Sequence, residues 1–231
     1  MEDMLQAFSV WALPALTAIT LHEASHGYVA DRLGDPTARL AGRLSLNPIR
    51  HVDPMGTVVL PALLLLLGAP FLFGWAKPVP VDPRRVTAMR SQRKAMAVIA
   101  AAGPGSNLVM ALVAGLLFWP ALSIGGTLGE WIVANLQNAV LFNVILAVFN
   151  LLPLPPLDGG RVAVGVLPRA LARPLERVEP YGFMILLGFL VAVPMLFTVL
   201  DIGFNPVSAI LFPPIEFVID LISDITRAVT G

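Results

Sequence analysis

The chain has 231 residues, of which 57% are hydrophobic and 13% charged, and its mean hydropathy is +0.80. Its formal net charge of zero gives no electrostatic basis for binding nucleic acid, and the absence of cysteine excludes disulfides, thiolate metal sites and cysteine nucleophiles. A surface this apolar suits a lipid bilayer, so we predict an all-α polytopic membrane protein with one domain over residues 1–231.

Five stretches come close to the roughly 20 apolar residues that a helix needs to cross a hydrocarbon core. The acidic N-terminus shows no cleavage signal, so we expect the first of these helices to remain in the mature protein. In chain order the predicted transmembrane helices are 5–30, 96–119, 131–152, 181–200 and 206–226.

Two intervening segments have a different character. Residues 31–54 contain short alternating runs such as ARLAGRLSL, which predict a small β element at the membrane surface. The apolar stretch 55–73 is interrupted by prolines and a glycine and runs into FGWAKPVPV, which we expect to be extended. We therefore predict that residues 55–80 form a re-entrant helix and strand segment that dips into the bilayer and returns.

The distribution of basic residues predicts the orientation, because Lys and Arg next to membrane helices are retained on the cytoplasmic side. Fourteen of the 15 basic residues lie in three connections, 31–54, 74–95 and 153–180, and the last is Arg227 near the C-terminus. If 55–73 returns without crossing, all of them fall on one side. We expect the N-terminus outside and the C-terminus in the cytoplasm.

The first predicted helix contains the motif LHEASHGYVAD. His22 and His26 are separated by one helical turn, so their imidazoles share a face and can chelate one metal ion. Glu23 lies beside them, where its carboxylate could take a proton from a water molecule that the metal has acidified. The alternative is that these side chains only bond to neighbouring carbonyl groups, but ionisable residues within membrane helices usually mark function.

A catalytic zinc site needs three protein ligands and one open position. The third histidine, His51, is in a polar loop, where we expect it to be solvated, so an acid should complete the set. Asp158 is the best candidate because prolines break the chain before it and two glycines after it allow close backbone approach. The alternative is that Asp158 only caps the following helix.

Topology supports this ligand set. His22 lies about 26 Å along the first helix and therefore near its cytoplasmic end. With 55–73 re-entrant, helix 131–152 runs back toward the cytoplasm and delivers Asp158 to the same side. We expect the active site near the cytoplasmic side of the membrane.

These motifs resemble those of the site-2 protease family of intramembrane zinc metalloproteases, and the similarity spans nearly the whole chain. The His-Glu-x-x-His motif is matched by His22, Glu23 and His26. The Asn-x-x-Pro segment leading to Asp-Gly is matched by Asn150, Pro153, Asp158 and Gly159, and the Gly-Pro-x-x-Asn element by Gly103, Pro104 and Asn107.

The resemblance implies a zinc metalloprotease, with one zinc ion per chain, that cleaves the transmembrane segment of a single-span membrane protein. It also implies a compact member of the bacterial type, located in the bacterial cell (inner) membrane. Asn150 would then hold the substrate or stabilise the oxyanion, and Asn107 would have a lesser part in the same task. The sequence shows neither the PDZ domain nor the nucleotide-sensing domain that many members of the family carry, and it gives no oligomeric state.

The extended segment around Trp75 and Val79 could offer a strand edge to an unwound substrate, or it could only shield the zinc from lipid. Two other functions are compatible with the motifs. The first is a membrane transporter for a metal ion, although transporters tend to show repeats and paired broken helices, and this sequence has one broken helix. The second is an inactive relative that binds membrane helices, against which the intact Glu23 argues.

Overall fold

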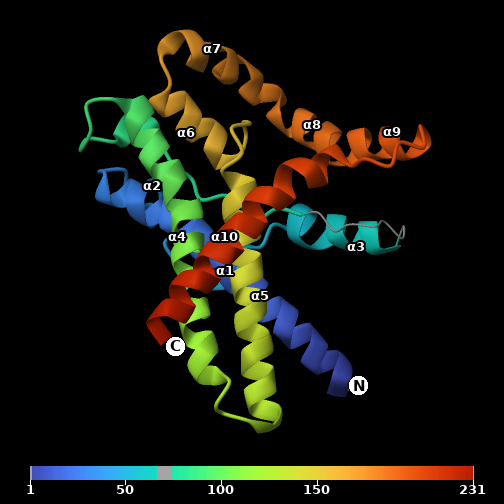
Figure 1. Cartoon of the computed structure of the whole chain (residues 1–231). Coiled ribbons are helices and arrows are strands. Elements are labelled where there is room, and N and C mark those ends of the chain that lie inside the picture. Colours follow the sequence, from blue (N-terminus) through green and yellow to red (C-terminus); the bar gives the residue numbers. More distant parts are fainter. Residues whose placement is uncertain (1, 67–73, 231) are drawn as a thin grey trace.

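The computed structural model describes residues 2–66 and 74–230, and every regular element among them is helical (Figure 1). The α-helices are α1 Glu2–Arg32, α2 Thr37–Leu40, α3 Leu60–Leu66, α4 Gln92–Ala121, α5 Gly126–Asn150, α6 Asp158–Val166, α7 Arg169–Val178, α8 Gly182–Leu187, α9 Val193–Val199 and α10 Pro206–Thr230. Shorter 3₁₀ or π-helical turns lie at Pro48–His51, Pro54–Val59, Pro83–Arg85, Glu179–Tyr181 and Gly188–Ala192.

Four helical runs among the described residues are long and apolar enough to cross a membrane, which makes this an integral membrane protein. They are Gln92–Ala121, Gly126–Asn150, Arg169–Val199 and Pro206–Thr230, and α1 is a further helix of 31 residues. The predicted helix 181–200 is part of a longer and less regular run, from α7 to α9. Prolines occur at positions 180 and 194 of this run, where the missing N–H prevents an unbroken helix.

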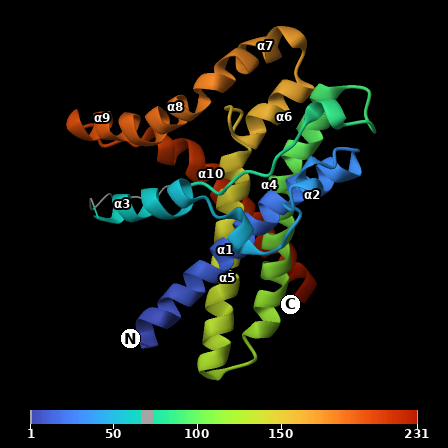
Figure 2. The same cartoon turned by 180° about the vertical axis from the view of Figure 1, so that it is seen from behind.

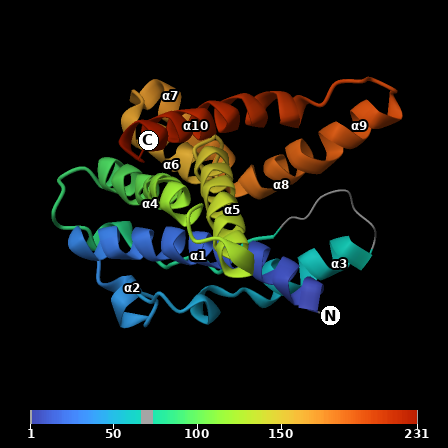
Figure 3. The same ribbon diagram turned by 60° about the horizontal axis from the view of Figure 1, so that its bottom comes forward.

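Helix α4 lies at the centre of the molecule and packs against α1, α5, α6 and α10 (Figures 1 and 2). Seen from a third direction, α10 and the run α7–α9 lie on one side of α4 and α5, while α1 and α2 lie on the other (Figure 3). The buried face of α4 is built mainly from small residues, which let helix backbones approach closely where no water drives their association. They are Ala95, Ala97, Ala100, Gly103, Ala111, Ala114, Gly115 and Ala121.

The C-terminal end of α10 lies at the far end of α4. Arg227 stacks over the ring of Trp119 with its guanidinium carbon 5.6 Å from the ring centroid, and the Trp119 indole N–H donates to Thr226. Arg93 is near the opposite end of this 30-residue helix, about 40 Å away along the axis. The packing of α10 on α4 therefore places Arg227 at the end of α4 opposite Arg93, whereas the sequence predicted that Arg227 shares a membrane side with the other basic residues.

The predicted β element at 31–54 is wrong, since the described residues contain no strand. The chain there forms α2 and a 3₁₀ turn at Pro48–His51. Its backbone is fixed by side chains instead of a partner strand: Asp35 accepts from the Thr37 N–H, Asn47 from the Ile49 N–H, and Asp53 from the N–H groups of the next turn. Polar residues that bond locally in this way compete with strand pairing.

Residues 74–82, which we call the strap, form an extended chain that leads from the end of the 55–73 stretch toward α4 (Figure 2). The Trp75 N–H donates to the Gly56 carbonyl over 3.2 Å, so the chain at Gly56 and the chain at Trp75 lie side by side. The described helix within it runs from Pro54 to Leu66, about 20 Å, which is short of a full crossing. Residues 67–73, with the predicted breaks at Gly68 and Pro70, lie outside the described residues.

The far end of the strap is tied to the turn after α1. The buried Asp35 carboxylate accepts from the Asp82 N–H over 2.7 Å and from the Thr37 hydroxyl. Burial acts to raise the pKa of Asp35, but these hydrogen bonds and the positive charge of Arg85 outweigh it and lower the pKa below its ordinary value. Asp35 is therefore charged at neutral pH and holds α1, α2 and the strap together.

Candidate metal centre

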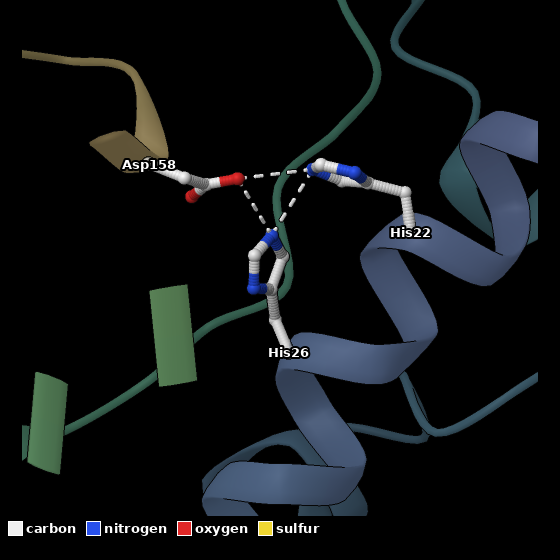
Figure 4. Close-up of side chains that lie close together, drawn as sticks. All are labelled: His22, His26 and Asp158. Atoms are coloured by element: carbon white, nitrogen blue, oxygen red, sulfur yellow. Dashed lines mark hydrogen bonds and ion pairs between the residues drawn. The ribbon is translucent and has the colours of Figure 1, made fainter. Parts of the chain in front are cut away.

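Three side chains from two distant parts of the chain converge in the interior (Figure 4). His22 and His26 project from one face of α1, and Asp158 reaches them from the first residue of α6. Asp158 Oδ2 is 3.1 Å from His22 Nε2 and 3.3 Å from His26 Nε2, and the two Nε2 atoms are 3.2 Å apart. His22 and Asp158 are 6% and 8% exposed, so a charge at this point is poorly solvated.

The outer nitrogen of each imidazole is held by a hydrogen-bond acceptor on α4. His22 Nδ1 donates to Asn107 Oδ1 over 2.6 Å, and His26 Nδ1 donates to the Ile99 carbonyl over 2.8 Å. These bonds place the ring protons on Nδ1 and leave both Nε2 lone pairs directed inward. Support of this kind fixes the tautomer and the ring orientation of metal-binding histidines.

With both ring protons on Nδ1, three acceptor atoms face one another, an arrangement that a bound cation stabilises. A tetrahedral zinc ion bound about 2.0–2.1 Å from three such atoms would separate them by roughly 3.3 Å. The observed separations are 3.1–3.3 Å. Two imidazoles and one carboxylate are a ligand set of catalytic zinc sites, so the residues fit a zinc ion with one position left open.

The orientation of Asn107 is fixed by a second amide. Asn107 is fully buried, and its Nδ2 donates to Asn143 Oδ1 over 2.7 Å and to the Ala18 carbonyl over 3.3 Å. Asn143 in turn donates to a carbonyl of its own helix, α5. A chain of hydrogen bonds thus runs from α5 through α4 to the His22 ring. Sequence reasoning missed Asn143, although its place two helical turns before Asn150 on an apolar helix was a usable signal.

Glycines make room for this cluster. A Cβ at Gly103 would lie 2.5 Å from His26 Nε2 and 2.6 Å from His22 Cε1, which explains the glycine of the Gly-Pro-x-x-Asn element. A Cβ at Gly159 or Gly160 would lie within 2.4 Å of the backbone at residues 151–155. The cap of α6 is Leu157, and Asp158 makes no capping bond, so Asp158 is not the simple N-cap of the alternative reading.

The ligand cluster opens into a cavity of about 830 Å³ that also contains most of the other predicted residues. Glu23, Asn150, Trp75 and Val79 all line it, together with the three ligands. Glu23 Oε2 accepts a hydrogen bond from the Val79 N–H over 3.1 Å. Asn150 bonds to the Leu146 carbonyl of its own helix.

Two residues differ from their predicted roles. Asn107 does not line the cavity and holds His22 from behind, so its position is that of a supporting residue. His51 is 2% exposed, and the prediction of a solvated histidine is wrong. Its ring Nε2 donates to the Ser45 carbonyl over 2.8 Å, and its own carbonyl accepts from the Lys77 N–H, because the strap folds over this loop and buries it.

Comparisons with known proteins identify zinc metalloproteases as relatives of this chain. The model of "Peptidase family M50" matches residues 121–193, the part that includes Asp158. The "Putative zinc metalloprotease YwhC" of Bacillus subtilis is 38% identical over 176 residues, which cover 74% of this chain and 75% of that protein. The "Putative zinc metalloprotease Rip2" of Mycolicibacterium smegmatis is 32% identical over 180 residues, 76% of this chain and 64% of the relative. No solved structure matches the chain.

Proposed function

Because the chain belongs to peptidase family M50, the site-2 protease family, we propose that it is a zinc endopeptidase that hydrolyses peptide bonds within the transmembrane segments of other membrane proteins. One observation carries the proposal: His22, His26 and Asp158 converge with zinc geometry in a cavity that also contains Glu23. The cavity lies among helices suited to a bilayer, which supports a substrate that is itself embedded in the membrane.

The residues of the cavity divide the chemistry between them. Zinc held by the two histidines and Asp158 would supply Lewis-acid activation of water and of the scissile carbonyl group. Glu23 Oε1, the oxygen that does not bond to Val79, is suited to accept the proton of the attacking water and to return it to the leaving nitrogen. Asn150 would bind the substrate backbone or the developing oxyanion through its amide.

We further propose that the site lies near the cytoplasmic face and that 55–80 is re-entrant. Two observations support this: fourteen of the 15 basic residues lie in the connections 31–54, 74–95 and 153–180, and the Trp75 N–H donates to the Gly56 carbonyl. Reporter fusions at Arg50 and Lys77 test both statements, since the two positions should report the same side. Reports from opposite faces would contradict the re-entrant arrangement.

The contribution of the strap to substrate binding is constrained by its own hydrogen bonds. The N–H groups of Trp75, Lys77 and Val79 already donate within the protein, and Pro78 and Pro80 have no N–H. The carbonyl groups of Trp75, Lys77 and Pro78 also accept hydrogen bonds from side chains of the protein. This favours a limited pairing over the full strand addition that the sequence suggested.

The test of the function is to co-express the protein with a panel of epitope-tagged single-span membrane proteins and to compare wild type with Glu23→Gln. We expect zinc in both proteins and trimming of a reporter by the wild type alone. A metal transporter would instead move zinc in a Glu23-independent way, and an inactive relative would trim nothing. Cleavage that persists in Glu23→Gln would refute the assignment of the base.

A further inference from the structure

The strap makes one contact with the catalytic machinery that neither a substrate edge nor a lipid shield requires. The backbone N–H of Val79 donates to Glu23 Oε2 over 3.1 Å, and Val79 is 8% exposed. We infer that the strap positions the catalytic base: the Val79 N–H holds one oxygen of the Glu23 carboxylate and thereby directs the other toward the metal. This inference rests on the proposed function, because it takes Glu23 to be the base.

The sequence of α1 is arranged for this contact. Glu23 and Gly27 are one turn apart on a face adjacent to that of His22 and His26. A Cβ at Gly27 would lie 3.0 Å from Val79 Cγ1 and 2.6 Å from Leu44 Cδ2, so glycine lets the strap lie directly on the helix. The motif HEASHG thus contains two interleaved pairs of residues. His22 and His26 face the candidate metal site, and Glu23 and Gly27 face the strap.

The strap is held rigidly enough to act as a support. The Lys77 N–H donates to the His51 carbonyl over 2.9 Å, and the buried Arg43 guanidinium donates to the Lys77 carbonyl over 2.7 Å. The Trp75 carbonyl accepts from the Thr57 hydroxyl over 2.8 Å. These bonds hold both the N–H and the carbonyl of Lys77, two residues before Val79. They therefore fix the position of the backbone from which the Val79 N–H reaches Glu23.

Glu23 needs such a partner. It is a partly exposed side chain at the edge of a cavity of about 830 Å³, and a long carboxylate there has several rotamers. A bond from one fixed backbone N–H removes most of that freedom and costs nothing at the moment of reaction. Val79 is therefore a positioning residue that acts through Glu23.

The contact can be measured without activity, by hydrogen–deuterium exchange in the intact, zinc-loaded protein. Replacing Glu23 with alanine removes the acceptor of the Val79 N–H. One amide hydrogen in residues 74–82 should therefore exchange faster than in the wild type. The matched control is Glu176→Ala, which alters another carboxylate that lines the same cavity and pairs with Arg93. Unchanged exchange in Glu23→Ala, or an equal change in the control, would overturn the inference.

The functional consequence is tested with Val79→Pro. Val79 lies between Pro78 and Pro80, in a chain that is already extended, so a proline there removes the N–H with little change of conformation. We expect kcat to fall roughly ten- to a hundredfold with KM and zinc content retained, because a displaced catalytic group costs about that much. Val79→Ala keeps the N–H and should lose far less. Gly27→Ala should also lower kcat, but by less than Val79→Pro, because the added Cβ pushes the strap away from α1 without removing the Val79 N–H.

Substrate capture separates this function from strand pairing. Glu23→Gln leaves a substrate uncut, so binding can be measured without cleavage. The double variant Glu23→Gln, Val79→Pro should bind the reporter that the wild type cleaves as well as Glu23→Gln alone does. Loss of capture, loss of zinc, or a wild-type kcat in Val79→Pro would each overturn the inference. If the wild type trims no reporter, the proposed function fails, whereas the exchange experiment still decides whether the strap holds Glu23.

Discussion

Replacing Gly103 with alanine should displace both imidazoles of the metal centre. The added Cβ would lie 2.5 Å from His26 Nε2 and 2.6 Å from His22 Cε1. Ordinary contacts between such atoms are about 3.5 Å, so the rings must retreat by roughly 1 Å. Zinc sites tolerate deviations of only about 0.2 Å in their ligand distances. Two of the three ligands would therefore leave the range in which they bind one ion.

We expect the zinc affinity of Gly103→Ala to fall at least ten- to a hundredfold, about the loss that follows removal of a group supporting a metal ligand. The assay is a competition titration of purified protein with a chelator of known affinity, together with reporter cleavage. Gly105→Ala is the matched control, because it lies on the same helix and its added Cβ would meet nothing within 4 Å. A zinc affinity equal to that of the wild type, or an equal loss in the control, would refute the reasoning.

Three further predictions concern groups around the centre. Asn107→Ala should weaken zinc binding about ten- to a hundredfold in the same chelator titration, since the His22 N–H loses its acceptor; unchanged affinity would refute the supporting role. Asp158→Ala should lose bound zinc in metal analysis, whereas the exposed Asp201→Ala should keep it. Asp35→Asn should lower the free energy of unfolding at neutral pH by about 1–3 kcal/mol. Because the pKa of Asp35 is lowered in the fold, its contribution is present above the unfolded value of about 3.9 and is lost as pH falls through the folded pKa. The difference in melting temperature between Asp35→Asn and wild type should therefore shrink in acid, and a constant difference would contradict this account.

The membrane helices were predictable because a helix that crosses a bilayer needs roughly 20 consecutive, mostly apolar residues, which is a local property of the sequence. The observed α4, α5 and α10 enclose or closely match the apolar stretches 96–119, 131–152 and 206–226. The prediction failed where local pattern was not decisive. Alternation in 31–54 suggested strands, but Asp35, Asn47 and Asp53 bond their own neighbouring backbone and form turns.

The positions of charged and polar residues depended more on packing. His51 looked solvated in a polar loop, and only the return of the strap after the 55–73 stretch buries it. Arg227 looked like one of the cytoplasmic basic residues, but the packing of α10 on α4 places it over Trp119. Neither outcome has a local signal, because both depend on segments distant in the sequence.

The sequence by itself identified the three side chains that meet in the candidate metal centre. One helical turn between His22 and His26 sets their shared face, and the lack of cysteine left a carboxylate as the remaining ligand, with Asp158 marked by its glycines. Only the tertiary structure decided what supports these groups: Asn107 with Asn143 behind His22, and the Val79 N–H on Glu23. Spacing along a helix is local geometry, whereas a supporting hydrogen bond joins segments that meet only when the whole chain packs.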